Sequence, residues 1–82
     1  MSDISIRLFA ILRDRIGQET ELVSVADPVT VRRLLDALVL RHPDLAVLMA
    51  HCRVAVNRKF CPEDHVIQES DEVAIIPPLS GG

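Results

Sequence analysis

The sequence is short of aromatic residues. Its 82 residues include two phenylalanines, Phe9 and Phe60, and neither tyrosine nor tryptophan. Because 49% of the residues are nonetheless apolar, we expect one small domain with a modest core. That core must be built from valine, isoleucine, leucine and alanine.

Cysteine is also scarce, with only Cys52 and Cys61. Two thiolates are too few for an iron–sulfur cluster held by four cysteines, and they lack the paired spacing of a zinc site. The three histidines, His42, His51 and His65, are scattered and form no i, i+4 pair. We therefore expect no bound metal, no bound cofactor and two reduced cysteines.

Long apolar runs and an excess of basic residues are missing too. No window approaches the ~18 apolar residues of a membrane span, and the first residues lack the basic region of a secretory signal. The net charge is −3, and Lys59 is the single lysine beside eight arginines. No basic stripe is present to replace the counterions of a nucleic acid. We expect a cytoplasmic protein that binds neither membranes nor nucleic acids.

The apolar pattern predicts one main helix and several strands. Thr30 is the expected N-cap of the helix, whose apolar stripe is Val31, Leu34, Leu35 and Leu38 and which ends before Pro43. Shorter helical segments are expected over residues 12–17, stopped by Gly17, and over 45–50. Strands are expected over residues 4–10, 20–25, 54–57, 58–61 and 73–76. These elements predict an α+β domain with the main helix on one face of a mixed four- or five-stranded sheet.

No catalytic constellation stands out within these elements. The acidic residues between 63 and 72 lack the glycine-centred spacing of a calcium loop, and we expect them to form a solvated loop face. His51 and Cys52 are adjacent in sequence, and neighbours rarely face each other productively. We therefore turn to the end of the chain.

The last six residues differ from a frayed terminus. Two prolines cannot continue a sheet ladder, and glycines without a Cβ can pass through a narrow channel. From Pro78 to Gly82 the extended chain reaches roughly 16–18 Å. Residues 1–76 are the expected domain and 77–82 the expected tail. A Gly82 carboxylate adenylated with ATP can be attacked by sulfide, which leaves a terminal thiocarboxylate. The tail residues are Pro77, Pro78, Leu79, Ser80, Gly81 and Gly82.

Four segments, in order and over nearly the whole chain, resemble the small subunits of molybdopterin synthase, which are ubiquitin-like sulfur carriers of the β-grasp fold. Gly-Gly alone is a weak signal, whereas the combined pattern is specific. The segments are residues 8–14 with Gly17 (Leu-Phe-Ala-Ile-Leu-Arg-Asp), 30–35 (Thr-Val-Arg-Arg-Leu-Leu), 54–57 (Val-Ala-Val-Asn) and 71–82 (Asp-Glu-Val-Ala-Ile-Ile-Pro-Pro-Leu-Ser-Gly-Gly).

The resemblance implies a function in molybdenum cofactor biosynthesis. An E1-like adenylyltransferase would use ATP to activate Gly82, and a sulfur donor protein would convert it to the thiocarboxylate. The tail, Pro78, Leu79, Ser80 and Gly81, would then enter the large subunit of molybdopterin synthase, in a 2:2 heterotetramer. There the sulfur would pass to cyclic pyranopterin monophosphate. The large subunit would hold the catalytic residues, so this chain would be a non-catalytic, sulfur-donating subunit.

The resemblance also implies an apolar partner interface on the sheet, at Phe9, Phe60 and Ile76. The alternation in the first strand independently places Phe9 on the face away from the helix; the alternative is that the phenylalanines belong to the core. The sequence departs from the family at Ser70, where glycine is frequent, and at Leu79, where valine is common. If position 70 requires a positive φ, a serine costs about 1 kcal/mol there, or the turn differs.

Three other functions remain open. The first is a sulfur carrier of the same fold for another pathway, such as thiamin thiazole synthesis, although such carriers usually lack the double proline. The second is a ubiquitin-like modifier conjugated through Gly82 to lysines of other proteins. The third is an interaction domain with an inert tail, for which deleting Gly81 and Gly82 would change nothing.

Overall fold

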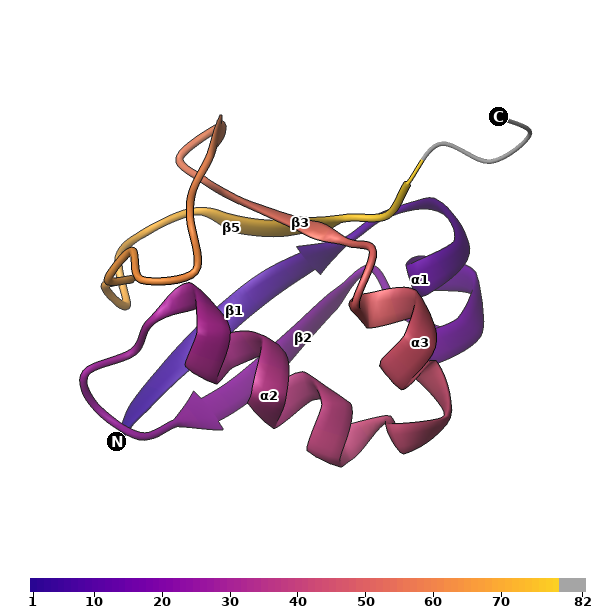
Figure 1. Ribbon diagram of the computed structural model, residues 1–82, viewed down its shortest axis with the longest axis horizontal. Coiled ribbons are helices and arrows are strands. Elements are labelled where there is room, and N and C mark those ends of the chain that lie inside the picture. Colours follow the sequence, from indigo (N-terminus) through magenta and orange to yellow (C-terminus); the bar gives the residue numbers. More distant parts are fainter. Residues whose placement is uncertain (79–82) are drawn as a thin grey trace.

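A computed structural model describes residues 1–78, which form a five-stranded sheet with helices packed against one face (Figure 1). The strand order is β2-β1-β5-β3-β4, in which β1 and β5 run parallel and the other neighbours antiparallel. This mixed sheet confirms the predicted architecture. The strands are β1 (Ser2–Leu8), β2 (Thr20–Val25), β3 (Arg53–Val56), β4 (Lys59–Phe60) and β5 (Val73–Ile76).

The main helix, α2 (Val31–Arg41), begins and ends as its sequence predicts. The Oγ1 atom of Thr30 accepts a hydrogen bond from the backbone N–H of Arg33 at 3.1 Å, which caps the first turn. Figure 1 shows α2 lying across the sheet, with α1 (Ala10–Ile16) and α3 (Ala46–Met49) towards one end. A 3₁₀ turn, η1 (Pro43–Leu45), joins α2 to α3. Within residues 1–78, the helices are too short or too polar to cross a membrane.

The core lies between α2 and the sheet. Leu34 and Leu38 of α2 are fully buried against alternate residues of the strands, as the stripe predicts, whereas Leu35 is half-buried. Each such leucine or isoleucine contributes roughly 1.5–3 kcal/mol when it leaves water. The fully buried strand residues include Ile4, Ile6, Val23, Val73 and Ile75. Their alternation leaves the other face of the sheet uncovered by α2.

The first strand ends earlier than predicted. β1 stops at Leu8, and Phe9 is the extended residue that precedes α1. Ala10 has a φ of 50°, which turns the chain into the helix two residues sooner than the expected start. The predicted stop is confirmed, because Gly17 has a φ of 88° and its N–H donates to the carbonyl of Arg13.

The hairpin between β3 and β4 also corrects the prediction. Asn57 and Arg58, expected in strands, are a two-residue turn with φ values of 52° and 71°. Positive φ at both central residues matches the twist of the two strands. Glycine is the usual residue at the second position of such a turn. Because this position is Arg58, the sequence did not predict the turn.

The acidic loop before β5 was predicted to be a solvated face, but specific hydrogen bonds hold part of it. Asp71 accepts hydrogen bonds from the backbone N–H of Gln68 at 2.7 Å and from Nδ2 of Asn57 at 3.0 Å. These bonds lower the pKa of Asp71. Ser70 is not at a positive φ, so the turn at this departure from the family pattern does not need glycine.

Candidate functional site

The base of the tail lies in the middle of the sheet. β5 pairs with β1 on one side and with β3 on the other, so its last residue, Ile76, is held by two neighbours. Pro77 is buried and Pro78 is exposed, so residue 78 is where the chain reaches the surface. The predicted tail residues Leu79, Ser80, Gly81 and Gly82 lie outside the described residues, and their roles stay predictions.

The three predicted interface residues lie on or beside the open face of the sheet, opposite α2. Phe9 is 36% exposed and Phe60 is 52% exposed, so neither belongs to the core. Phe9 and the half-buried Ile76 line the same concavity of about 280 Å³, together with Ala74 of β5 and Ala55 of β3. Phe60 is the cross-strand partner of Ala55. The structure thus gathers these residues around small apolar side chains, while their role in binding stays a prediction.

Three arginines surround this apolar area. The guanidinium carbon of Arg53 lies 3.8 Å from the centre of the Phe60 ring, and that of Arg7 lies 5.5 Å from the Phe9 ring. Both separations are within the range of cation–π contacts. Arg58, from the hairpin turn, lines the concavity together with Arg7. Alternation in β1 and β3 places Arg7 and Arg53 on this face, but sequence reasoning did not connect them with the phenylalanines.

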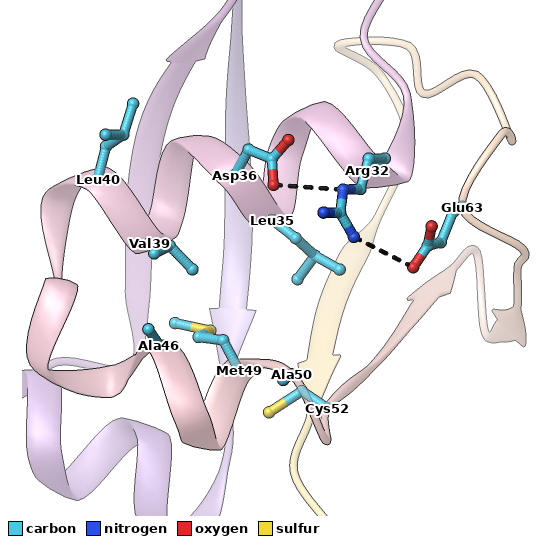
Figure 2. A pocket seen from close by; sticks show the side chains of 10 residues that line it. All are labelled: Arg32, Leu35, Asp36, Val39, Leu40, Ala46, Met49, Ala50, Cys52 and Glu63. Carbon is cyan, nitrogen blue, oxygen red and sulfur yellow. Dashed lines mark ion pairs between the residues drawn. The ribbon is translucent and has the colours of Figure 1, made fainter.

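A second and larger hollow lies on the helix side, between α2 and α3 (Figure 2). Its volume is about 540 Å³, and its walls include the apolar side chains of Leu35, Val39 and Met49. At its edge Arg32 pairs with Asp36 at 3.3 Å and with Glu63 at 3.5 Å, as Figure 2 shows. These charged side chains form ion pairs with one another. The described residues that line the hollow include no acid–base pair and no nucleophile paired with a base.

The cysteines have structural contacts. The thiol of Cys52 donates to the carbonyl of Leu48, and the thiol of Cys61 donates to the carbonyl of Lys59, both at 3.3 Å. Burial raises the pKa of the Cys52 thiol, which keeps it protonated and a poor nucleophile. Among residues 1–78, no three side chains of the metal-binding types come together in one place.

The histidines are likewise dispersed. His42 caps the end of α2, as expected for a helix-end residue, and its Nε2 lies 2.8 Å from Oε1 of Glu21. His51 is exposed and His65 is half-buried. The described part of the chain therefore shows an open sheet face with exposed apolar side chains and the base of the tail.

Sequence comparison decides the family. The sequence model of the ThiS family matches residues 6–82. The chain belongs to the ThiS family. Among curated members, it is 34% identical to a molybdopterin synthase sulfur carrier subunit of Arabidopsis thaliana over 80 residues, covering 98% of this chain and 83% of the relative. It is 36% identical to the protein of the same name from Chlamydomonas reinhardtii, covering 96% and 98%. These matches confirm the predicted resemblance.

Solved structures agree on the fold of this ThiS-family chain. The crystal structure of SAMP1 from Haloferax volcanii superimposes with a TM-score of 0.82 at 32% identity, covering 99% of this chain and all of the other. A Helicobacter pylori complex of subunits 1 and 2 of molybdopterin-converting factor contains a chain with a TM-score of 0.66. At 20% identity, that likeness supports the fold alone. The predicted ubiquitin-like β-grasp fold is confirmed.

Proposed function

We propose that this chain is the sulfur-carrying small subunit of molybdopterin synthase and that Gly82 carries the sulfur. The observation that supports the proposal most directly is the match to sulfur carrier subunits over almost the whole chain, in a family whose model extends to Gly82. The open sheet face beside the base of the tail gives a partner a surface to bind next to the segment that must enter it.

The proposed cycle begins with the Gly82 carboxylate, which is a poor electrophile until it is activated. Its oxygen attacks the α-phosphorus of ATP in an E1-like adenylyltransferase, and pyrophosphate leaves. Sulfide supplied by a donor protein then attacks the carbonyl, and AMP leaves. The product is a thiocarboxylate on a residue with no side chain to obstruct it.

The proposed acceptor complex is formed with the large subunit of molybdopterin synthase, in a 2:2 assembly. The large subunit packs on the face that contains Phe9, Phe60 and Ile76, while residues 78–82 enter its active site. Catalytic residues of the large subunit then direct sulfur to cyclic pyranopterin monophosphate, and water restores the Gly82 carboxylate. Aromatic anchors with a polar rim are common at such interfaces.

Intact-mass spectrometry tests the proposal. The protein is incubated with its E1-like enzyme, ATP and a sulfur donor, and we expect one terminal oxygen to be replaced by sulfur. Truncation after Gly81 should abolish the change, whereas Ser80→Ala, a tail change that keeps both glycines, should retain it. The thiolated protein is then given to the large subunit and the cyclic precursor. Failure to form dithiolene product there, with product from a thiazole synthase instead, would contradict this assignment.

A second candidate, a protein modifier, is supported by one further relative. The chain is 36% identical to small archaeal modifier protein 1 of Haloferax volcanii over 84 residues, covering 93% of this chain and 97% of that protein. Conjugation would use the same adenylated Gly82, with a lysine amine in place of sulfur as nucleophile. Isopeptide-linked species of higher mass in cell extracts, absent after truncation at Gly81, would support this activity.

A further inference from the structure

The concavity on the open sheet face is lined by charged residues whose net charge is opposite to that of the whole chain. The net charge of the protein is −3, yet Arg7, Arg53 and Arg58 gather around the apolar area beside the tail. Among the described residues that line the concavity, Glu72 is the one acid, and it lies 3.9 Å from Arg7. Both side chains of that pair are about half exposed to solvent, so it is weak.

Two of these arginines are coupled to the apolar anchors. Arg7 lies over Phe9 and Arg53 over Phe60, and a stacked guanidinium keeps its N–H groups free to donate at its edge. Arg53 is also the cross-strand partner of Ile76, directly before the tail. A partner that covers the phenylalanines therefore meets the arginine edges at the same time.

The third arginine is held by a rigid turn. The backbone N–H of Asn57 donates to the carbonyl of Glu72 at 2.7 Å, and Oδ1 of Asn57 accepts from the N–H of Glu72 at 2.9 Å. These bonds fix the turn in which Arg58 has a φ of 71°. An arginine in this unfavourable backbone region projects from a preorganised position beside the concavity.

An apolar centre with a basic rim favours an acidic protein surface over a phosphate backbone. Alanines at 55 and 74 and Ile76 line the concavity where a nucleic acid would need hydrogen-bond donors for its phosphates. Carboxylates, by contrast, accept the parallel N–H pairs of a guanidinium.

We infer that Arg7, Arg53 and Arg58 make this sheet face selective for a protein partner whose apolar docking surface is rimmed by Asp and Glu. The inference rests on the proposed function for the identity of the partner, the molybdopterin synthase large subunit of the same organism. The arginines accelerate encounter and orient the domain so that residue 78 faces the partner's active site. Rim charges of this kind act mainly on the association rate and on its dependence on salt.

The test compares two double variants with the same change in net charge. Arg7→Gln/Arg58→Gln removes two rim charges, and Arg15→Gln/Arg32→Gln removes two exposed arginines from α1 and α2. Association with the large subunit is measured by stopped-flow fluorescence at about 0.1 M and about 1 M NaCl, where the Debye length falls from about 10 to about 3 Å. We expect the rim variant to associate about five- to tenfold more slowly at the lower salt and less than twofold more slowly at the higher. Arg53→Gln should add to the loss.

The outcomes separate the inference from the proposed function. Equal association rates for both double variants would overturn the inference and leave the proposed function intact. Absence of binding by the wild-type chain at either salt concentration would overturn both. Binding of a fluorescein-labelled oligouridylate with the same dependence on Arg7 and Arg58 would also overturn the inference, because it would make the face a site for phosphates. Circular dichroism of each variant confirms that the sheet is folded.

Discussion

Glu21 is the one charged residue buried among residues 1–78, and its two partners are not buried to the same degree. Its side chain is 2% exposed, whereas Arg41 is 52% and His42 is 25% exposed. Nε of Arg41 lies 2.5 Å from Oε2 of Glu21, and Nε2 of His42 lies 2.8 Å from Oε1. This cluster joins the start of β2 to the end of α2. The Glu21 carboxylate loses nearly all of its contact with water, whereas Arg41 and His42 keep part of theirs.

We predict that the two sides of the cluster contribute unequally to the free energy of unfolding. Replacing Arg41 and His42 by alanine strands a carboxylate in the core, which costs about 3–5 kcal/mol. Glu21→Met leaves an arginine and a histidine that water can solvate and an apolar side chain in an apolar site, so the change should be within about 1 kcal/mol. The whole domain has roughly 4–12 kcal/mol of stability, so only the first change threatens folding.

Urea unfolding followed by circular dichroism at neutral pH measures both variants. Glu21→Met in the Arg41→Ala/His42→Ala background should recover most of the lost stability, because the unpaired charge is gone. Equal slopes against urea would show that the unfolded states are comparable. A Glu21→Met protein as unstable as the double alanine variant would refute the reasoning, since the cost would then lie in the lost contact and not in a stranded charge.

Two further predictions concern the loop and the first helix. Hydrogen bonds from Gln68 and Asn57 lower the pKa of Asp71. The contribution of Asp71 to stability is therefore complete above its unfolded pKa and is lost as the pH falls through the lower folded pKa. Asp71→Asn should flatten the acid side of a plot of urea midpoint against pH, and an unchanged slope would count against this. Gly17 has a φ of 88° with no atom within 4 Å of an added Cβ. Gly17→Ala should therefore cost only about 1–2 kcal/mol in thermal unfolding, and a much larger loss would reveal a steric clash.

The sequence predicted those elements correctly whose structure depends on residues close together in the chain. Thr30 and the stripe over 31–38 predict α2 because the cap and its N–H partner are three residues apart. Gly17 and the double proline likewise act through their own backbone angles. Phe9 follows a strand whose alternation already points it away from the core.

Contacts between distant residues set the limits of that prediction. Alternation places Glu21 on the buried face with Val23, but nothing near position 21 shows that Arg41 and His42 will reach it. The stacking of Arg53 on Phe60 depends on the register of a two-residue strand after the Asn57–Arg58 turn. Because no glycine marks that turn, neither the turn itself nor the position of Arg58 beside the concavity could be predicted from the sequence.

Two variants of Arg58 separate the cost of its positive φ to stability from the effect of its charge on binding at the open sheet face. Arg58→Gly relieves a positive φ of 71°, whereas Arg58→Gln keeps the strained Cβ and removes the same charge. The glycine variant should be about 1 kcal/mol more stable than the glutamine variant in urea unfolding. Both should associate with the large subunit equally slowly, because each lacks the guanidinium. Equal stabilities would show that the turn stores no strain, and a glycine variant that binds at the wild-type rate would show that Arg58 has no part in recognition. A more stable protein that binds more slowly would mean that arginine is kept in this turn for the surface it presents and not for the fold.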